Sequence, residues 1–135
     1  DEPELNLHPA NQRRLARFIT ALVNHGIKIF ITTHSDYIVK EFNTLIMLNQ
    51  ESPKLQSIRE KFADYLPEDK LDPKCVSLYM AHYARIERPG YRRKIKAKAL
   101  IKAEISSTLG IEAKSFDETI DDMNNIQEAI YYGLN

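Results

Sequence analysis

The sequence predicts an α/β fold that begins with part of a parallel sheet. An acidic pair at residues 1–2 is followed by a helical segment and by apolar segments at 27–32 and 44–49. Alternating strands and helices are typical of α/β proteins. The helical segment also supplies the crossover of a dozen or more residues that parallel strands require. Residues 1–49 are therefore expected to form a strand end, a helix, a strand, a short helix and a strand.

Local signals mark the ends of the first helix. Pro9 suits the first helical position, where its missing N–H has no partner to lose. His25 and Gly26 end the segment, because glycine readily adopts the left-handed conformation that follows a helix. Between these signals, apolar side chains recur at helical spacing. They are Leu15, Phe18, Ile19, Leu22 and Val23.

The next elements are shorter. Residues 27–32 are apolar and β-branched, which predicts a buried strand, and the preceding helix favours a parallel one. Ser35 is expected to cap the N-terminus of a short helix over residues 36–41. Residues 44–49 are expected to form the following strand. The acidic residues 1–2 then lie at the carboxyl end of one strand, and the polar residues after residue 31 lie at the carboxyl end of another. Catalytic groups of such sheets gather at these ends.

The remaining chain predicts a helical and β-rich extension. Ser52 and Pro53 begin a helix with apolar residues on one face as far as Leu66. A strand is expected over 76–83 and a turn over 88–91. Apolar and charged residues alternate over 95–105, which favours a strand, although its alanines and lysines are helix formers. Ser115 and Glu118 have the spacing of a capping box, followed by a helix to about residue 132.

The overall charge argues against one class of function. Nineteen basic residues balance nineteen acidic ones, so the chain is not a globally basic nucleic-acid binder. The charge is locally uneven, since residues 85–102 hold eight Lys and Arg against Glu87, whereas residues 112–128 are mainly acidic. The basic run predicts a solvated strand face. A nucleic-acid contact is the alternative, with Tyr79, Tyr83 and Tyr91 available for stacking on bases.

Two features bear on the cellular setting. Cys75 is the single cysteine and cannot form an internal disulfide, so a reducing, cytoplasmic setting is expected. No apolar run approaches membrane-spanning length, so no membrane partner is expected.

The acidic pair and His34 together suit nucleotide hydrolysis. One carboxylate can hold Mg²⁺, usually through water, and a second can orient or deprotonate the attacking water. Successive side chains leave a strand in different directions, so Asp1 and Glu2 can divide these tasks. A histidine at the neighbouring strand end can hydrogen-bond the terminal phosphate. The four histidines match no compact ligand spacing, which disfavours a zinc site.

The motif Asp1-Glu2-Pro3-Glu4-x-x-Leu7-His8-Pro9-x-x-Gln12, followed by Ile31-Thr32-Thr33-His34-Ser35, resembles a known family. It is similar to the Walker B, D-loop and switch-histidine segments of ABC-type ATPases, which are P-loop NTPases. The similarity is greatest to the AAA-named branch related to the OLD and RecF-like proteins. It covers residues 1–49 well and the remainder more weakly.

The resemblance implies a role for each matching residue. Asp1 would be the Mg²⁺-associated aspartate, Glu2 the catalytic glutamate and His34 the switch histidine. Residues 4–8 would form the D-loop, which in this family meets a second head domain across bound ATP, so Asn6 and His8 would lie at the nucleotide. His8 has an alternative role, because it can cap or pack against the helix that follows it.

The phosphate-binding loop G-x-x-x-x-G-K-[S/T] occurs nowhere in these residues. The resemblance therefore implies the C-terminal portion of an ABC-type head, with residues 1–50 as the ATPase part and 51–135 as its β-hairpin and helical extension. The intact protein would hydrolyse ATP and act with nucleic acid or a nuclease partner, in DNA repair or phage defence. The alternatives are a non-catalytic dimerisation or scaffold module and a nucleic-acid-binding fragment.

Overall fold

The computed structural model describes residues 1–62, 64–87, 89–90, 92–112 and 126–127. The chain divides into two compact units. Unit 1 consists of Asp1–Ser77 and Ile105–Ile111, and it contains the candidate site. Unit 2 includes Leu78–Glu104. The fold is mixed α/β, with small two-stranded sheets among the described residues.

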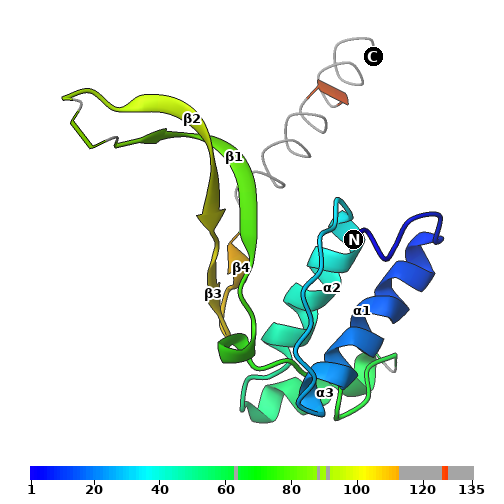
Figure 1. Cartoon of the computed structure of the whole chain (residues 1–135). Coiled ribbons are helices and arrows are strands. Elements are labelled where there is room, and N and C mark those ends of the chain that lie inside the picture. Colours follow the sequence, from blue (N-terminus) through cyan, green and yellow to red (C-terminus); the bar gives the residue numbers. More distant parts are fainter. Residues whose placement is uncertain (63, 88, 91, 113–125, 128–135) are drawn as a thin grey trace, which may run out of the picture. The chain divides into compact units, whose positions relative to one another are not determined.

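Unit 1 is built on two packed helices, α1 (Pro9–Asn24) and α2 (Asp36–Met47), which lie side by side in Figure 1. The prediction for α1 is confirmed, since Pro9 occupies its first turn and Gly26 follows it with a φ of 84°. The buried face of α1 includes Ala16 and Ile19, and α2 contributes the largest fully buried side chains. These are Ile38, Leu45 and Ile46.

The end of α2 corrects the predicted strand over 44–49. Ser35 caps the helix as predicted, its side chain accepting a hydrogen bond from the N–H of Ile38 at 3.2 Å. The helix then continues to Met47 rather than ending near residue 41. The physical reason is spacing. Leu45 follows Ile38 by seven residues, two helical turns, so both face the core.

The predicted buried strand over 27–32 is also wrong. This segment is assigned to no strand, and its side chains are largely exposed, with Phe30 at 90%. The reason is the lack of partners, because no strand among the described residues pairs with it. A single backbone hydrogen bond, from the N–H of Glu2 to the carbonyl of Thr32 at 2.8 Å, joins it to the start of the chain. Residues 1–49 thus form no parallel sheet in this structure.

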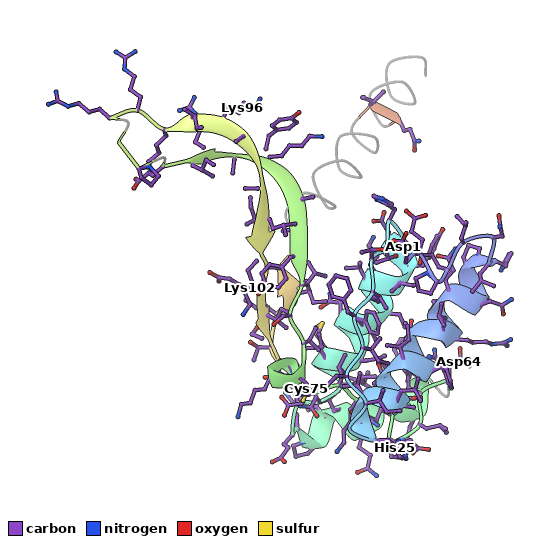
Figure 2. All side chains as sticks on the ribbon, viewed as in Figure 1. Asp1, His25, Asp64, Cys75, Lys96 and Lys102 are labelled. Carbon is purple, nitrogen blue, oxygen red and sulfur yellow. The ribbon has the colours of Figure 1, made fainter. Side chains whose placement is uncertain are left out.

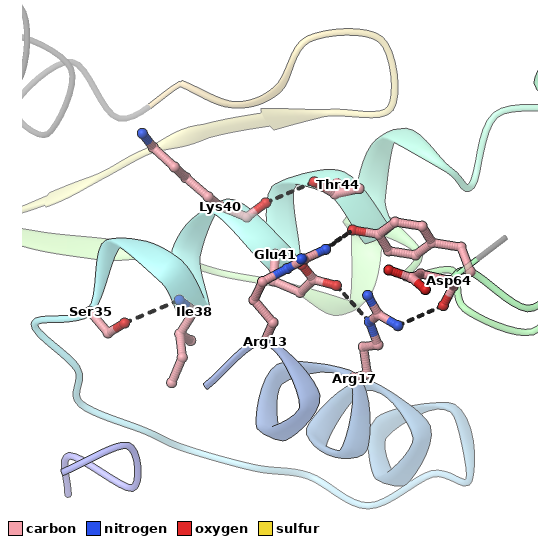
Figure 3. Close-up of polar contacts among 9 residues, drawn as sticks. Arg13, Arg17, Ser35, Ile38, Lys40, Glu41, Thr44 and Asp64 are labelled. Atoms are coloured by element: carbon pink, nitrogen blue, oxygen red, sulfur yellow. Dashed lines mark hydrogen bonds and ion pairs between the residues drawn. The ribbon is translucent and has the colours of Figure 1, made fainter. Parts of the chain in front are cut away.

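A cluster of ion pairs links α1 to α2 (Figure 3). The sequence did not suggest it. Glu41 on α2 is 3% exposed, and its two carboxylate oxygens accept hydrogen bonds from Arg13 and Arg17 of α1, each at 2.7 Å. Tyr65 donates a third bond to Glu41 at 3.2 Å. Arg17 also donates to the backbone carbonyl of Asp64 at 2.7 Å. Hydrogen bonding to Glu41 raises the pKa of Arg13 above its already high value.

The remaining helices of unit 1 are short. Helix α3 (Pro53–Lys61) begins at Ser52 and Pro53 as predicted but ends before Leu66. Its apolar side chains lie mostly in solvent, with Ile58 exposed, so no packing supports a longer helix. The 3₁₀ helix η1 (Pro73–Cys75) follows a connector whose Leu71 is buried.

Unit 2 contains an antiparallel hairpin of β1 (Tyr79–Ile86) and β2 (Ile95–Lys102). The period-two pattern over 95–105 is confirmed as a strand through Lys102. The strand predicted over 76–83 lies three residues later, because pairing with β2 begins at Tyr79. Pro89 and Gly90 lie in the turn that the sequence predicts. The predicted capping box and helix over 115–132 lie outside the described residues, apart from 126–127, which are helical.

A second small sheet pairs β3 (Glu104–Ser106) with β4 (Gly110–Glu112). Asn43 of α2 holds the start of β4, since its side-chain oxygen accepts a hydrogen bond from the N–H of Ile111 at 2.8 Å. Gly110 has a φ of +74°, and a Cβ placed there would lie 1.6 Å from the same oxygen. Both its conformation and its contact therefore require glycine.

Replacing Gly110 by alanine should lower the free energy of unfolding by more than the roughly 1–2 kcal/mol that a left-handed conformation costs. Gly26→Ala is the matched control, because Gly26 has a φ of +84° and no atom within 4 Å of a Cβ placed there. Urea unfolding of both variants measures the difference. Equal losses would show that the Asn43 side chain moves aside at no cost.

Candidate functional site

Two segments distant in sequence meet at the start of the chain. The backbone hydrogen bond from Glu2 to Thr32 brings them together. The Thr32 hydroxyl donates to the carboxylate of Asp1. The Nε2 atom of His34 lies 3.4 Å from a carboxylate oxygen of Glu2. Figure 2 shows Asp1 at the end of unit 1 where α2 begins. The structure therefore gathers Asp1, Glu2 and His34 in one place, although without the sheet that was expected to align them.

These three side chains remain accessible to a ligand. The His34 side chain is 92% exposed and that of Glu2 is 39% exposed. Asp1 is also exposed. A carboxylate beside an imidazole can accept a proton from water while the imidazole donates a hydrogen bond to an anion. The arrangement is thus chemically suited to hydrolysis of a bound, negatively charged group.

Glu4 is a positioning residue that sequence reasoning did not identify. It is 7% exposed, and its Oε1 atom accepts hydrogen bonds from the Thr33 hydroxyl and, at 3.2 Å, from the N–H of His34. The Thr33 hydroxyl oxygen also accepts from the N–H of Ser35 at 3.0 Å. One buried carboxylate therefore sets the backbone that carries His34. The signal was present as a second acid in Asp-Glu-Pro-Glu opposite the polar run Thr-Thr-His-Ser.

Hydrogen bonding decides the ionisation of Glu4. Burial, the largest influence, raises the pKa of its carboxyl. The hydrogen bond from the Thr33 hydroxyl and the nearby backbone N–H groups, that of His34 among them, outweigh burial, so the pKa is lowered from its ordinary value of 4.5. The Oε2 atom is buried and has no hydrogen-bond partner among the described residues. The carboxylate is therefore held charged by bonds to a single oxygen.

The lowered pKa of Glu4 gives a pH prediction. A depressed folded-state pKa contributes stability that is present above pH 4.5 and is lost as the pH falls through the folded value. The difference in free energy of unfolding between the wild type and Glu4→Gln should therefore be largest near neutral pH and shrink below about pH 4.5. Urea unfolding across this range measures it. A difference that grows on acidification would contradict the assignment.

Two residues near the site adopt an uncommon backbone conformation. Glu2 has a φ of 41° and Asn6 a φ of 64°. Asparagine tolerates this region, whereas for glutamate it is unusual and costs roughly 1–3 kcal/mol. Such conformations cluster at functional sites. The turn at Glu2 therefore supports the interpretation that this segment is more than a structural connection.

The other two predicted site residues are placed differently. The Nδ1 atom of His8 accepts a hydrogen bond from the N–H of Ala10 at 3.3 Å, so His8 caps α1. Asn6 is exposed in the turn between Glu4 and His8. In the part of the chain that the structure describes, neither side chain hydrogen-bonds Asp1, Glu2 or His34. A nucleotide-contacting role for Asn6 and His8 stays a prediction.

Asp1 offers an oxygen donor of the kind that Mg²⁺ binds. Across the described residues, no group of three or more His, Cys, Asp or Glu side chains could hold a metal ion by itself. Mg²⁺ in nucleotide sites usually takes one or two carboxylates and completes its shell with water and substrate phosphates. The exposed carboxylate of Asp1 fits this requirement.

Comparison with known proteins bears on the same segment. Residues 1–39 match the family model of the AAA ATPase domain. The match contains Asp1, Glu2, Glu4 and His34 and ends within α2. It supports an AAA-type ATPase domain and, at a general level, ATP binding and hydrolysis. No curated protein and no solved structure matches the chain. Separately, none of the helices in the described ranges is both long and apolar enough to cross a membrane.

Proposed function

We propose that residues 1–39 form the carboxylate and histidine side of an ATP-hydrolysing site. The observation that carries the proposal is the contact between the Glu2 carboxylate and the His34 imidazole, 3.4 Å apart, within the segment matched by the AAA ATPase domain. Hydrolysis of a nucleotide depends mainly on positioning and charge stabilisation, so few protein groups are needed. This segment supplies two of them in accessible positions.

Each residue has a distinct task in the proposed site. Glu2 accepts a proton from the attacking water, since its carboxylate is accessible and lies beside the His34 imidazole. His34 donates a hydrogen bond to the terminal phosphate. Glu4 acts through the backbone and keeps His34 beside Glu2. Asp1 would hold Mg²⁺, which neutralises phosphate charge when bound.

We further propose that the segment belongs to an ABC-type head. Asp1 and Glu2 would belong to a Walker B motif, residues 4–8 to a D-loop and His34 to the switch position of an ABC-type head. The phosphate-binding loop would come from residues outside this sequence. Residues 1–50 would be the ATPase part and 51–135 its extension.

A second head domain would close over the nucleotide near Asn6 and His8. The intact protein would act in the cytoplasm, coupled to nucleic-acid processing or to a nuclease partner in defence or repair. The rival is a scaffold in which the same segment dimerises without catalysis. ATP turnover of the intact protein with variants at Glu2 and His34 separates the two, since a scaffold would lose no turnover in either variant.

A further inference from the structure

The β1–β2 hairpin has two chemically different faces. Directly opposed residues of an antiparallel pair project to the same face, and neighbours along each strand alternate. The register pairs Tyr79 with Lys102, Tyr83 with Lys98 and Arg85 with Lys96. One face therefore carries two tyrosines and four cations. On the opposite face, the residues that β2 contributes, at positions 95, 97, 99 and 101, are all aliphatic.

The face with the cations, here called the basic face, contains no acidic residue. Its members are Tyr79, Ala81, Tyr83, Arg85, Lys96, Lys98, Leu100 and Lys102. All eight are exposed. Within the described ranges, the ion pair of this hairpin lies near its tip, where Glu87 and Lys94 are 3.3 Å apart. Among the described residues, no carboxylate therefore lies within ion-pair distance of the four cations of this face. They are Arg85, Lys96, Lys98 and Lys102.

The spacing of the basic face suits a linear polyanion. Strand residues rise roughly 3.3 Å each, so Lys96 and Lys102 mark the ends of a row about 20 Å long. Figure 2 shows both residues on β2. A compact acidic ligand would meet only part of such a row, whereas a chain of phosphates can follow its length. The charge arrangement thus favours a nucleic-acid backbone.

The tyrosines indicate how the bases would be held. Tyr79 and Tyr83 are 57% and 54% exposed, on the same face as the cations. The ammonium groups of Lys96 and Lys98 lie 5.4 Å and 5.7 Å from the centre of the Tyr83 ring. Cationic grooves with exposed aromatic rings bind single strands, because rings stack on unpaired bases while cations contact phosphates. The bases of a duplex are paired and stacked on one another, so a duplex would offer its phosphates to the cations but no free base to the tyrosines.

We infer that the basic face of the β1–β2 hairpin binds single-stranded nucleic acid. Arg85, Lys96, Lys98 and Lys102 contact the phosphates, and Tyr79 and Tyr83 stack on bases. This site goes beyond the proposed ATPase function and shares no residue with it. Loss of one activity therefore need not entail loss of the other.

Fluorescence anisotropy of a labelled oligothymidine of about 20 nucleotides tests the inference with the 135-residue chain. Four phosphate contacts to a single strand give a slope of roughly −2.8 in log affinity against log salt concentration. Affinity should then fall roughly 50-fold between 50 and 200 mM salt. The double variant Lys96→Glu/Lys98→Glu should bind at least roughly tenfold more weakly and with a shallower slope. Tyr83→Ala should cost roughly fivefold or more.

The matched control is Lys54→Glu/Lys74→Glu, which makes the same change in net charge at exposed positions of unit 1. It should bind as the wild type does, and circular dichroism verifies that every variant is folded. Absent or salt-insensitive binding would overturn the inference, as would equal losses in the control. Preference for a duplex of the same length, or binding to phosphatidylserine vesicles without binding to the oligonucleotide, would also overturn it.

Discussion

Replacing Glu2 by glutamine is expected to lower ATP turnover of the intact protein by roughly 10²–10⁴-fold, the range typical of a lost general base. The amide keeps the size of the side chain but cannot accept a proton at neutral pH. ATP binding should persist, because Asp1 and the hydrogen bonds of Glu4 are untouched. A phosphate-release assay measures turnover, and equilibrium binding of labelled ATP measures affinity.

The control for this substitution is Glu51→Gln, an exposed acid between α2 and α3. Its turnover should equal that of the wild type. His34→Ala should also slow hydrolysis, since the hydrogen-bond donor beside Glu2 is lost. Unchanged turnover in Glu2→Gln would remove Glu2 from the catalytic machinery. Loss of ATP binding in the same variant would indicate a role in binding rather than in proton transfer.

Replacing Glu41 by alanine should destabilise unit 1 by about 3 kcal/mol, as expected when one member of a buried ionic network is removed. The loss leaves Arg13 and Arg17 facing each other without their shared carboxylate and deprives the Tyr65 hydroxyl of an acceptor. The arginines are 42% and 22% exposed and can partly regain water, which places the effect at the lower end of the usual range. Urea unfolding followed by circular dichroism measures the change.

Glu60→Ala serves as the matched control, because Glu60 is an exposed acid on α3. Surface substitutions of this kind usually change stability by less than about 0.5 kcal/mol. A similarly small effect at Glu41 would show that its ion pairs contribute no more than ordinary surface pairs. Destabilisation of the expected size would identify the network as the main polar link between α1 and α2.

The elements that the sequence predicted well are those with local signals. Pro9 and Gly26 delimit α1, and Ser35 begins α2, because caps depend on neighbouring backbone groups alone. The apolar run at 44–49 was misassigned since a short run of this kind fits a strand or a buried helix equally well. The outcome was decided by the helical spacing of Leu45 from Ile38, which places both side chains in the core of unit 1.

One long-range polar contact was predictable from the sequence, and the others were not. The meeting of Glu2 and His34 followed from the expectation that strand ends gather, and the contact forms even though residues 27–32 join no described strand. Glu41 pairs with arginines 24 and 28 residues earlier, so spacing along the chain gave no indication of it. The buried role of Glu4 was hidden for the same reason.

The carboxylate of Glu4 holds the main chain of residue 34 and leaves its ring alone. The location of the histidine and the direction in which its imidazole points are consequently governed by different acids. The imidazole can rotate about its side-chain bonds while the hydrogen bond from the His34 N–H to Glu4 is kept. A change of charge next to Glu2 would therefore rotate the His34 imidazole and leave the backbone of residue 34 in place.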